Sequence, residues 1–296
     1  MTIISSTTQK IKHLDALKKI ATIDKYKYTQ SEEIGKKILA YTPLLYKKMG
    51  NRKDRPEPIA SSFLLKFENS YFLITASHVV PNGNITGLGL FFNSTFFNLD
   101  GECLYTKTKN IEDDKLDILI VKLSELFIKE IGAAFLFFDI NNINVDIADV
   151  SGDCYLVIGY PITRIKLNIA QKKELKFPFI FRTNIQQQNK IHKHLKTNEN
   201  YNLIFYYGKH DIQNSKTGIS QEGPKPNGLS GCGVWLITDL LDTTFSSFMP
   251  VSMLIEYDAK FNVFVTTRIR LITESIRNKW QIEIQQTKKF HLDLIY

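Results

Sequence analysis

The chain has 296 residues, of which 43% are hydrophobic and 23% are charged, and it carries a net charge of +8 at pH 7. This amount of apolar material predicts one large or two small globular domains. No apolar run approaches the length of a membrane-spanning helix, and the N-terminus lacks the apolar segment of a secretory signal, so we expect neither a membrane protein nor a secreted one.

The chain has three cysteines, Cys103, Cys154 and Cys232, an odd number at wide spacings. This pattern fits neither a disulfide framework nor a zinc site. We therefore expect a cytoplasmic protein in a reducing compartment, in which the glycosylation sequons at Asn84 and Asn93 are incidental.

Most of the positive charges are lysines spread along the chain, with the richest windows at 166–176 and 190–196. Nucleic-acid-binding proteins more often concentrate arginine and lysine on one element, together with aromatic residues or within a known module. The sequence contains no such element. The pattern favours a solvated basic surface over contact with nucleic acid or an acidic partner.

Residues 8–50 have the spacing of helices. Apolar residues recur every three positions between Ile11 and Ile20, with lysines between them. Ser31 opens a second expected helix, whose apolar face consists of Ile34, Ile38, Tyr41 and Leu45. Pro43 kinks or ends this helix, and the charged, proline-containing segment 51–58 is typical of a linker. The two helices either pack on the domain that follows or bind a partner, and packing is the favoured alternative.

From Ile59 onward the pattern changes to short strands separated by turns. Segments 63–67 and 71–75 flank a Glu-Asn-Ser turn and predict a hairpin. The polar segment 184–201 is predicted to be a long loop, and 271–280 has the spacing of a helix. Many short strands without regular helix alternation indicate an all-β barrel or sandwich. Further strands are expected at 90–92, 96–97, 115–123, 155–159, 179–183, 203–207, 234–238, 253–257 and 263–269.

Ser230 lies in a glycine-rich segment, Gly228-Leu229-Ser230-Gly231, shortly before the apolar run 234–237. A serine acts as a nucleophile only where a base removes its proton and hydrogen-bond donors stabilise the oxyanion that follows. Neighbouring glycines let a substrate carbonyl approach the main-chain N–H groups, here those of Gly228 and Ser230. The alternative is a tight turn that leads into a strand.

Two further residues have the settings of a base and of an acid that orients it. His78 ends an apolar strand after two small residues, and Asp117 stands at the head of another strand, where an isolated carboxylate would be costly to bury. Each has a structural alternative, since His78 could be a core histidine and Asp117 could cap a strand or meet a lysine. Together with Ser230 they supply a base, a group that orients the base, and a nucleophile.

Three segments carry a resemblance to a known family. Thr75-Ala76-Ser77-His78-Val79, Asp117-Ile118-Leu119-Ile120-Val121 and Gly228-Leu229-Ser230-Gly231 resemble, in this order, the signature segments of the chymotrypsin/trypsin-like serine proteases. The Thr-Ala-x-His segment is the most specific of them. Gly159-Tyr160-Pro161 is similar to a segment of intracellular, bacterial-type members, and the resemblance covers roughly residues 59–280.

The resemblance implies an all-β fold of two six-stranded antiparallel β-barrels with the site in the cleft between them, an N-terminal helical extension and a C-terminal helix. Residues 1–55 would be the extension and linker, and residues 56–296 the protease domain. It implies a serine endopeptidase that hydrolyses peptide bonds through an acyl-enzyme with His78, Asp117 and Ser230, and needs no metal or cofactor. The expected partners are a protein or peptide substrate and a regulatory protein. Similar bacterial members of the family are sometimes paired with a sensor protein in defence.

The serine loop departs from the family's pattern at two places, where Leu229 replaces the usual aspartate and Cys232 the usual glycine. Without the aspartate, activation by cleavage of a pro-segment is not expected. Cys232 is expected to be a small core residue, with a reactive thiol as the alternative. The segments 223–227 and 251–257, which would line the specificity pocket, offer no obvious carboxylate at its base. This favours an apolar or small substrate side chain, unless Glu256 points inward.

An unregulated cytoplasmic protease is harmful, so we expect a gate, for which the N-terminal helices and the segment 184–201 are candidates. His192 and His194 in that segment could share a metal, but no third ligand lies nearby in the sequence. Two alternatives from other classes are a protease-fold binding module without turnover and a basic nucleic-acid-associated protein. The complete set of three residues argues against the first, and a steep salt dependence of binding would support the second.

Overall fold

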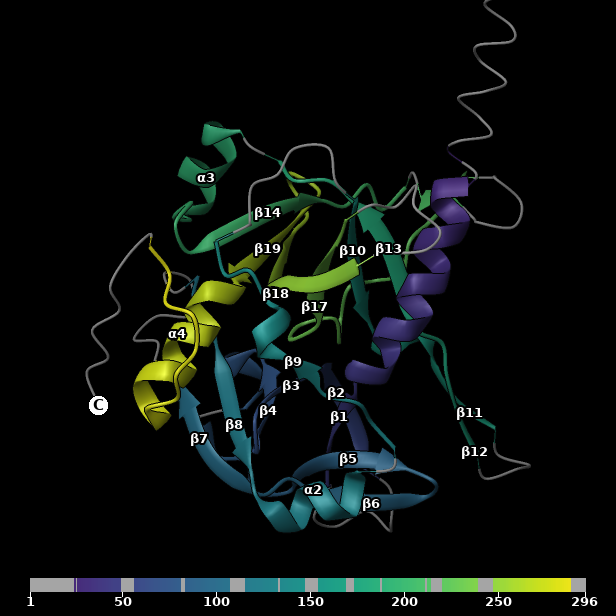
Figure 1. Cartoon of the computed structure of the whole chain (residues 1–296). Helices are drawn as coiled ribbons and strands as arrows, with labels where there is room; N and C mark the ends of the chain where they lie inside the picture. The colour runs from purple at the N-terminus through teal and green to yellow at the C-terminus, as the bar shows by residue number, and fades with distance from the viewer. Residues whose placement is uncertain are drawn as a thin grey trace, which may run out of the picture.

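The computed structural model describes residues 24, 26–48, 56–80, 83–106, 115–132, 134–146, 154–168, 173–186, 188–210, 212–213, 220–238 and 247–288 (Figure 1). The helix expected between Ile11 and Ile20 lies outside these residues. Within them, no helix has both the length and the apolar character needed to cross a membrane.

The N-terminal half folds into two sheets. The first has the strand order β2-β1-β5-β6, and the second has the order β7-β8-β4-β3-β9, in which only the β3–β9 pair is parallel. The described elements in chain order are a helix over 26–38, η1 (Leu39–Tyr41), β1 (Leu44–Lys47), β2 (Glu57–Ser61), β3 (Phe63–Phe67), β4 (Ser70–Thr75), η2 (Ser77–Val79), β5 (Leu88–Phe92), β6 (Thr95–Asn98), β7 (Gly101–Tyr105), β8 (Leu119–Leu123), α2 (Glu125–Ile131), β9 (Phe138–Asp139) and η4 (Ile140–Asn142).

The C-terminal half is built on one antiparallel sheet of six strands in the order β13-β10-β17-β18-β19-β14. Two short hairpins, β11–β12 and β15–β16, stand apart from it. The elements in chain order are β10 (Cys154–Gly159), η5 (Ile162–Arg164), β11 (Ile165–Asn168), β12 (Lys173–Lys176), β13 (Phe179–Thr183), α3 (Asn189–Leu195), β14 (Asn202–Tyr206), β15 (Ile212–Gln213), β16 (Ser220–Gln221), β17 (Gly233–Thr238), β18 (Ser247–Asp258), β19 (Val263–Arg268) and α4 (Ile269–Trp280).

The all-β class expected from the sequence is confirmed. The two six-stranded barrels that were also expected are not formed by the hydrogen-bonded strands that the structure describes. The N-terminal half has sheets of four and five strands, and only the C-terminal half has a sheet of six. The edges of that six-stranded sheet approach each other through a single antiparallel bridge between Ile185 and Phe205. The C-terminal helix is present as α4, which contacts β18 and β19.

The β3–β4 hairpin, which leads to His78, is buried on both of its faces. Phe63 and Ile74 pair across the hairpin and lie in a cluster that includes Trp235 of the C-terminal sheet. Leu64 and Leu73, the next pair, lie in a separate cluster of the N-terminal sheets. Each fully buried side chain of this size contributes about 1.5–3 kcal/mol of hydrophobic stabilisation. The hairpin is therefore a firm support for the turn that follows β4.

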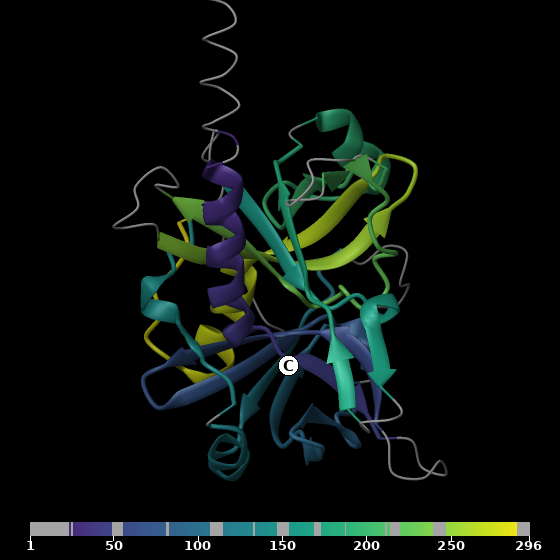
Figure 2. The same ribbon diagram turned by 90° about the vertical axis from the view of Figure 1, so that its right-hand side faces the viewer.

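The helix over 26–38 packs against the fold. Ile34 and Ile38 are buried in the cluster that also holds strands of the C-terminal sheet, and a Cβ on Gly35 would lie 2.6 Å from Ile180 of β13. Figures 1 and 2 show the helix running along the outside of this sheet and ending near the N-terminal sheets. Tyr41, just after the helix, stacks edge-on against Phe138 with ring centroids 5.7 Å apart.

Several boundaries expected in the N-terminal segment need correction. The helix begins before Ser31, whose hydroxyl donates to the carbonyl of Lys27 at 2.7 Å. Leu45 lies in strand β1 rather than on a helix face, because the chain passes through Pro43 into a ladder with β2 and β5. The segment 51–58, expected to be a linker, overlaps β2. Part of residues 1–55 thus belongs to a sheet.

The segment 184–201, expected to be a long loop, contains the helix α3. Its apolar residues are too few to produce a helical pattern in the sequence. Ile191 and Leu195, four positions apart, are its buried apolar residues, and His192 is buried with them. The lysine-rich window 166–176, expected to be basic surface, forms most of the hairpin β11–β12. In Figure 1 this hairpin extends away from the sheets.

Candidate active site

His78 lies in the 3-10 turn η2, directly after the buried end of β4. Thr75 and Ala76 are fully buried, and Ala76 is still extended, so the chain leaves the sheet and turns at Ser77. The N–H of Val80 donates to the carbonyl of Ser77 at 2.9 Å and closes the turn. The side chain of His78 remains 38% exposed, whereas Ser77 before it is buried.

The carboxylate of Asp117 contacts His78 at two points. Its Oδ2 lies 2.5 Å from the Nδ1 of the imidazole, and its Oδ1 accepts a hydrogen bond from the backbone N–H of His78 at 2.8 Å. The Asp117 side chain is only 12% exposed. A carboxylate bound in this way fixes both the orientation and the tautomer of the ring, because Nδ1 must carry the proton that it donates. The other nitrogen, Nε2, is then free to accept a proton.

Asp117 stands two residues before β8 and adopts a left-handed backbone conformation, with φ of +38°. Aspartate is one of the few non-glycine residues that occupy this region regularly. The carbonyl of Asp117 accepts a hydrogen bond from the N–H of Ser77 at 3.3 Å, so the two loops are joined through their backbones as well.

The loop before Asp117 is anchored to the C-terminal sheet. The Asn202 amide of β14 donates to the carbonyl of Lys115 at 2.6 Å, and the Thr267 hydroxyl of β19 donates to the carbonyl of Leu116 at 2.5 Å. The ammonium group of Lys115 forms an ion pair with Glu256 of β18. Three contacts from three strands therefore hold the Asp117 loop against the other half of the molecule.

The pKa of His78 is raised above its ordinary value of 6.5, chiefly by the hydrogen bond to Asp117. Partial burial opposes this shift, while the negative charges of Asp117 and Glu256 add to it. Glu256, considered from the sequence as a candidate for the specificity pocket, instead pairs with Lys115 and acts on the charge of His78. The protonated ring is the form that the site stabilises.

The serine loop is a compact turn between β16 and β17. The N–H of Leu229 donates to the carbonyl of Pro226, and that of Cys232 to the carbonyl of Leu229, both at 2.9 Å. Gly228 and Gly231 have φ of +90° and +86°, which side-chain-bearing residues rarely adopt. Ser230 is partly exposed between the buried Leu229 and the buried Gly231, so the turn presents the hydroxyl-bearing residue at the surface.

Ser61, at the end of β2, joins the serine loop to the His78 loop. Its hydroxyl donates to the carbonyl of Gly228 and accepts from the N–H of Tyr160, both at 2.8 Å. Its backbone N–H donates to the carbonyl of Ser230 at 3.1 Å, and its carbonyl accepts from the Thr75 hydroxyl at 2.9 Å. Thr75 is the last residue of β4, three positions before His78. A single buried residue therefore fixes the spacing of the two loops.

The N–H groups of Gly228 and Ser230, expected to form the oxyanion hole, donate no hydrogen bond to another described residue, whereas those of Leu229, Gly231 and Cys232 do. Unpaired N–H groups cost free energy if they are buried. Here they lie on partly exposed residues, and they are the two donors that an oxyanion would need.

The structure brings His78 and Asp117 into direct contact and places Ser230 on a loop tied to theirs. No hydrogen bond joins Ser230 to His78 among the described residues. Such contacts are often long in enzymes without substrate and shorten in the complex. Ser61, Asn202 and Thr267 were not predicted, because small polar residues on strands carry no signal of what they contact.

Cys232 is fully buried in the core of the six-stranded sheet, as expected of a small core residue. Burial raises the pKa of its thiol far above the usual range, so the thiolate does not form at neutral pH. A nucleophilic or redox role for this cysteine is therefore not supported.

His192 and His194 do not share a site. The Nδ1 of His192 lies 2.8 Å from the Thr197 hydroxyl, whereas the ring of His194 packs edge-on against Phe261 with centroids 4.8 Å apart. Within the described residues, no group of three histidine, cysteine or acidic side chains could hold a metal ion.

Comparison with known proteins identifies the fold. Neither the protein-family models nor the curated proteins include a match. Among solved structures, the chain is similar to the VesB protease of Vibrio cholerae, with a TM-score of 0.52 and 11% sequence identity. The alignment covers 80% of this chain but 63% of that one, less than two thirds of its length. The mostly β-sheet architecture is thus similar in fold to that structure.

Proposed function

We propose that this chain is a serine endopeptidase of the trypsin-like class. Ser230 would be the nucleophile, His78 the general base and acid, and Asp117 the residue that holds His78 in its tautomer. The N–H groups of Gly228 and Ser230 would receive the oxyanion. The observation that carries the proposal is the two-point contact of the Asp117 carboxylate with His78, on a loop that Ser61 joins to the glycine turn of Ser230.

The proposed reaction has two steps, acylation of Ser230 and hydrolysis of the acyl-enzyme. His78 Nε2 takes the proton of Ser230 as its Oγ bonds to the peptide carbonyl, and returns it to the leaving amine as the C–N bond breaks. Water then attacks the acyl-enzyme and gives a proton to His78, and His78 passes that proton to Ser230 Oγ as the ester bond breaks, which releases a carboxylic acid and restores the free enzyme. Each donor to the oxyanion is typically worth roughly 3–4 kcal/mol in the transition state.

The substrate would be a protein or peptide with an apolar or small side chain before the cleaved bond. We propose a reducing, cytoplasmic location, which rests on the odd number and wide spacing of the three cysteines. A regulatory protein partner and a role in bacterial defence remain predictions from the resemblance.

A peptide-library digestion tests the proposal. Purified protein is incubated with a mixture of unstructured peptides, and new termini are identified by mass spectrometry. We expect cleavage by wild type and by His194→Ala, an exposed histidine on α3, and none by His78→Ala or Ser230→Ala. Cleavage that survives Ser230→Ala would show a contaminating or different activity. Binding of peptides without new termini would favour the alternative of a protease-fold binding module.

A further inference from the structure

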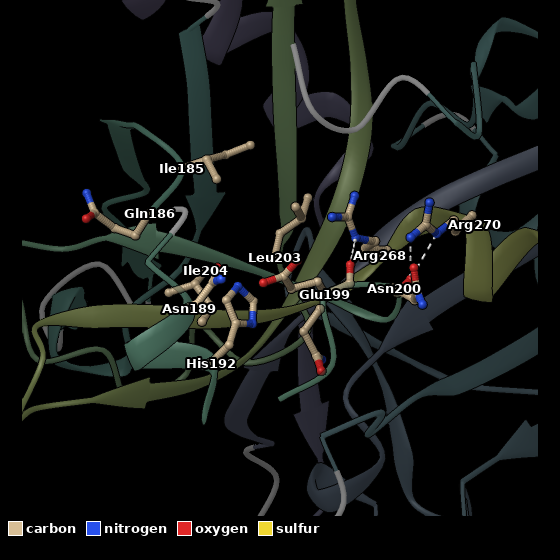
Figure 3. Close-up of a pocket in the computed structure, with 11 residues that line it drawn as sticks. Ile185, Gln186, Asn189, His192, Glu199, Asn200, Leu203, Ile204, Arg268 and Arg270 are labelled. Atoms are coloured by element: carbon tan, nitrogen blue, oxygen red, sulfur yellow. Dashed lines mark hydrogen bonds between the residues drawn. The ribbon is translucent and has the colours of Figure 1, made fainter. Parts of the chain in front are cut away.

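A hollow lies on the C-terminal half, between α3, β14 and the junction of β19 with α4 (Figure 3). Its volume is about 400 Å³, within the range of small-molecule sites. His78, Asp117 and Ser230 are not among the residues that line it. The proposed reaction uses none of its side chains, so the hollow needs its own explanation.

One wall carries two buried arginines. Arg268 is 5% exposed and Arg270 is 2% exposed. Arg268 Nε donates to the carbonyl of Glu199 at 2.8 Å, and Arg270 donates to the carbonyl of Asn200 with two nitrogens, at 3.0 and 2.5 Å. These contacts hold both guanidinium groups in fixed positions. Fixed, planar guanidinium groups recognise phosphate and carboxylate oxygens with geometric specificity.

The facing wall carries polar side chains without a charge, together with apolar ones. Gln186, Asn189 and His192 lie across from the arginines in Figure 3. Burial lowers the pKa of His192, which keeps the ring neutral at physiological pH. A neutral imidazole and two amides both donate and accept hydrogen bonds. Glu199 is the one carboxylate among the described lining residues, against two arginines.

The pocket is joined to the loop of Asp117 by two direct contacts. Asn202, which lines the pocket, donates its side-chain amide to the carbonyl of Lys115 at 2.6 Å. Thr267, adjacent to Arg268 in β19, donates to the carbonyl of Leu116 at 2.5 Å. A ligand that moves either strand must therefore act on the residues directly before Asp117.

We propose that this pocket binds a small organic anion carrying a phosphate or carboxylate group, and that its occupation is coupled to the Asp117 loop. The anionic group lies against Arg268 and Arg270, and the polar remainder lies against Gln186, Asn189 and His192. Binding is independent of the proposed protease function. Only an effect of the ligand on catalysis rests on that function.

Calorimetric titration of the full chain with inorganic phosphate, pyrophosphate, AMP and citrate tests the site and distinguishes phosphate from carboxylate chemistry. We expect saturable one-to-one binding of at least one of these anions. Arg268→Gln should weaken it about tenfold or more, the usual effect of losing hydrogen bonds to a charged group. Arg182→Gln, which removes the same charge from an exposed position on β13, should leave it unchanged.

Asn189→Trp guards against misfolding of the arginine variant, because it adds bulk at an exposed position on the rim of the pocket. This variant should fold normally and lose binding.

The coupling is measured by the amide resonances of Lys115 and Ile118, which should shift when the anion is added. Absence of saturable binding for all four anions, or equal binding by wild type and Asn189→Trp, would overturn the site. Binding without any shift at Lys115 or Ile118 would overturn the coupling. Failure of peptide cleavage would refute the proposed function and leave both readouts intact.

Discussion

The carboxylate of Asp117 holds His78 by two atoms, with Oδ2 2.5 Å from the ring Nδ1 and Oδ1 2.8 Å from the backbone nitrogen. The second contact ties the carboxylate to the main chain of the residue whose ring it orients. The ring therefore cannot turn away from Asp117 without breaking a hydrogen bond to a largely buried carboxylate, which costs more than losing one to water.

The first prediction concerns the titration of His78. Its pKa lies above 6.5 in the folded protein because of Asp117. The stabilising contact with protonated His78 is complete below about 6.5 and is lost as the pH rises through the raised value. A base must be neutral, so activity increases as the pH rises through the same value. Titration of the ring resonances by NMR measures this midpoint.

Two variants resolve the causes of this shift. Asp117→Asn removes the largest cause and should lower the midpoint clearly, while Glu256→Gln removes a weaker charge effect and should lower it less. Loss of the orienting carboxylate should also reduce activity by about 10,000-fold. A midpoint that Asp117→Asn leaves unchanged would contradict the assigned contact.

The second prediction concerns Ser61. Ser61→Ala removes the hydroxyl that bridges the carbonyl of Gly228 and the N–H of Tyr160. We expect the free energy of unfolding to fall by about 1–3 kcal/mol. Covalent labelling of Ser230 by a fluorophosphonate probe, which reacts with activated serines, should also slow, because the loop that carries Ser230 is less fixed. Ser62→Ala is the matched control, since the neighbouring hydroxyl is equally buried but donates to Pro43, outside the serine loop. Equal slowing in both variants would refute a specific role for Ser61.

The third prediction concerns the close approach of Gly231 to β4. A Cβ atom there would lie 2.1 Å from the Thr75 hydroxyl and 2.3 Å from the Ser61 carbonyl, at a φ of +86°. Gly231→Ala should lower the free energy of unfolding by roughly 3 kcal/mol, from backbone strain and overpacking together. Gly87→Ala is the control, because it has a similar φ of +75° but meets only the Lys48 carbonyl, at 4.0 Å. It should cost about 1 kcal/mol in denaturant unfolding, and similar losses for both variants would show that no close contact exists.

The fourth prediction concerns the cysteines. Cys103 is partly exposed, whereas Cys154 and Cys232 are buried. Iodoacetamide should therefore modify Cys103 in the folded protein and reach Cys154 and Cys232 only after unfolding, as mass spectrometry of digested samples will show. Rapid modification of Cys232 in the folded state would contradict its burial and restore the thiol as a candidate nucleophile.

Much of the sheet structure could be predicted from the sequence, because strands such as β4 and β17 are apolar on both faces and stand out from the turns between them. The elements that were missed lack this signal. β1 has only four residues after Pro43, and its Leu45 fitted a helical spacing equally well. α2 carried a usable signal that was overlooked, since Ser124 caps it by accepting from the N–H of Phe127.

The residues of the candidate site were predictable only because three local segments resembled a family. Their supports were not, because Ser61 and Asn202 contact residues far away in sequence, at 228 and 115. The left-handed conformation of Asp117 was likewise hidden, since the segment 115–123 was expected to be a continuous strand. Which residues become hydrogen-bond partners depends on the folded arrangement. The periodicity of a sequence indicates only which faces of its elements are buried.

Labelling with a fluorophosphonate probe tests most directly whether His78 and Asp117 activate Ser230. The probe bonds covalently to activated serines, and mass spectrometry locates the adduct. We expect an adduct on Ser230 of wild type and of Ser70→Ala, and none on His78→Ala or Ser230→Ala. A folded wild type that stays unlabelled, alone and with cell lysate added, or an adduct at another residue, would contradict this activation.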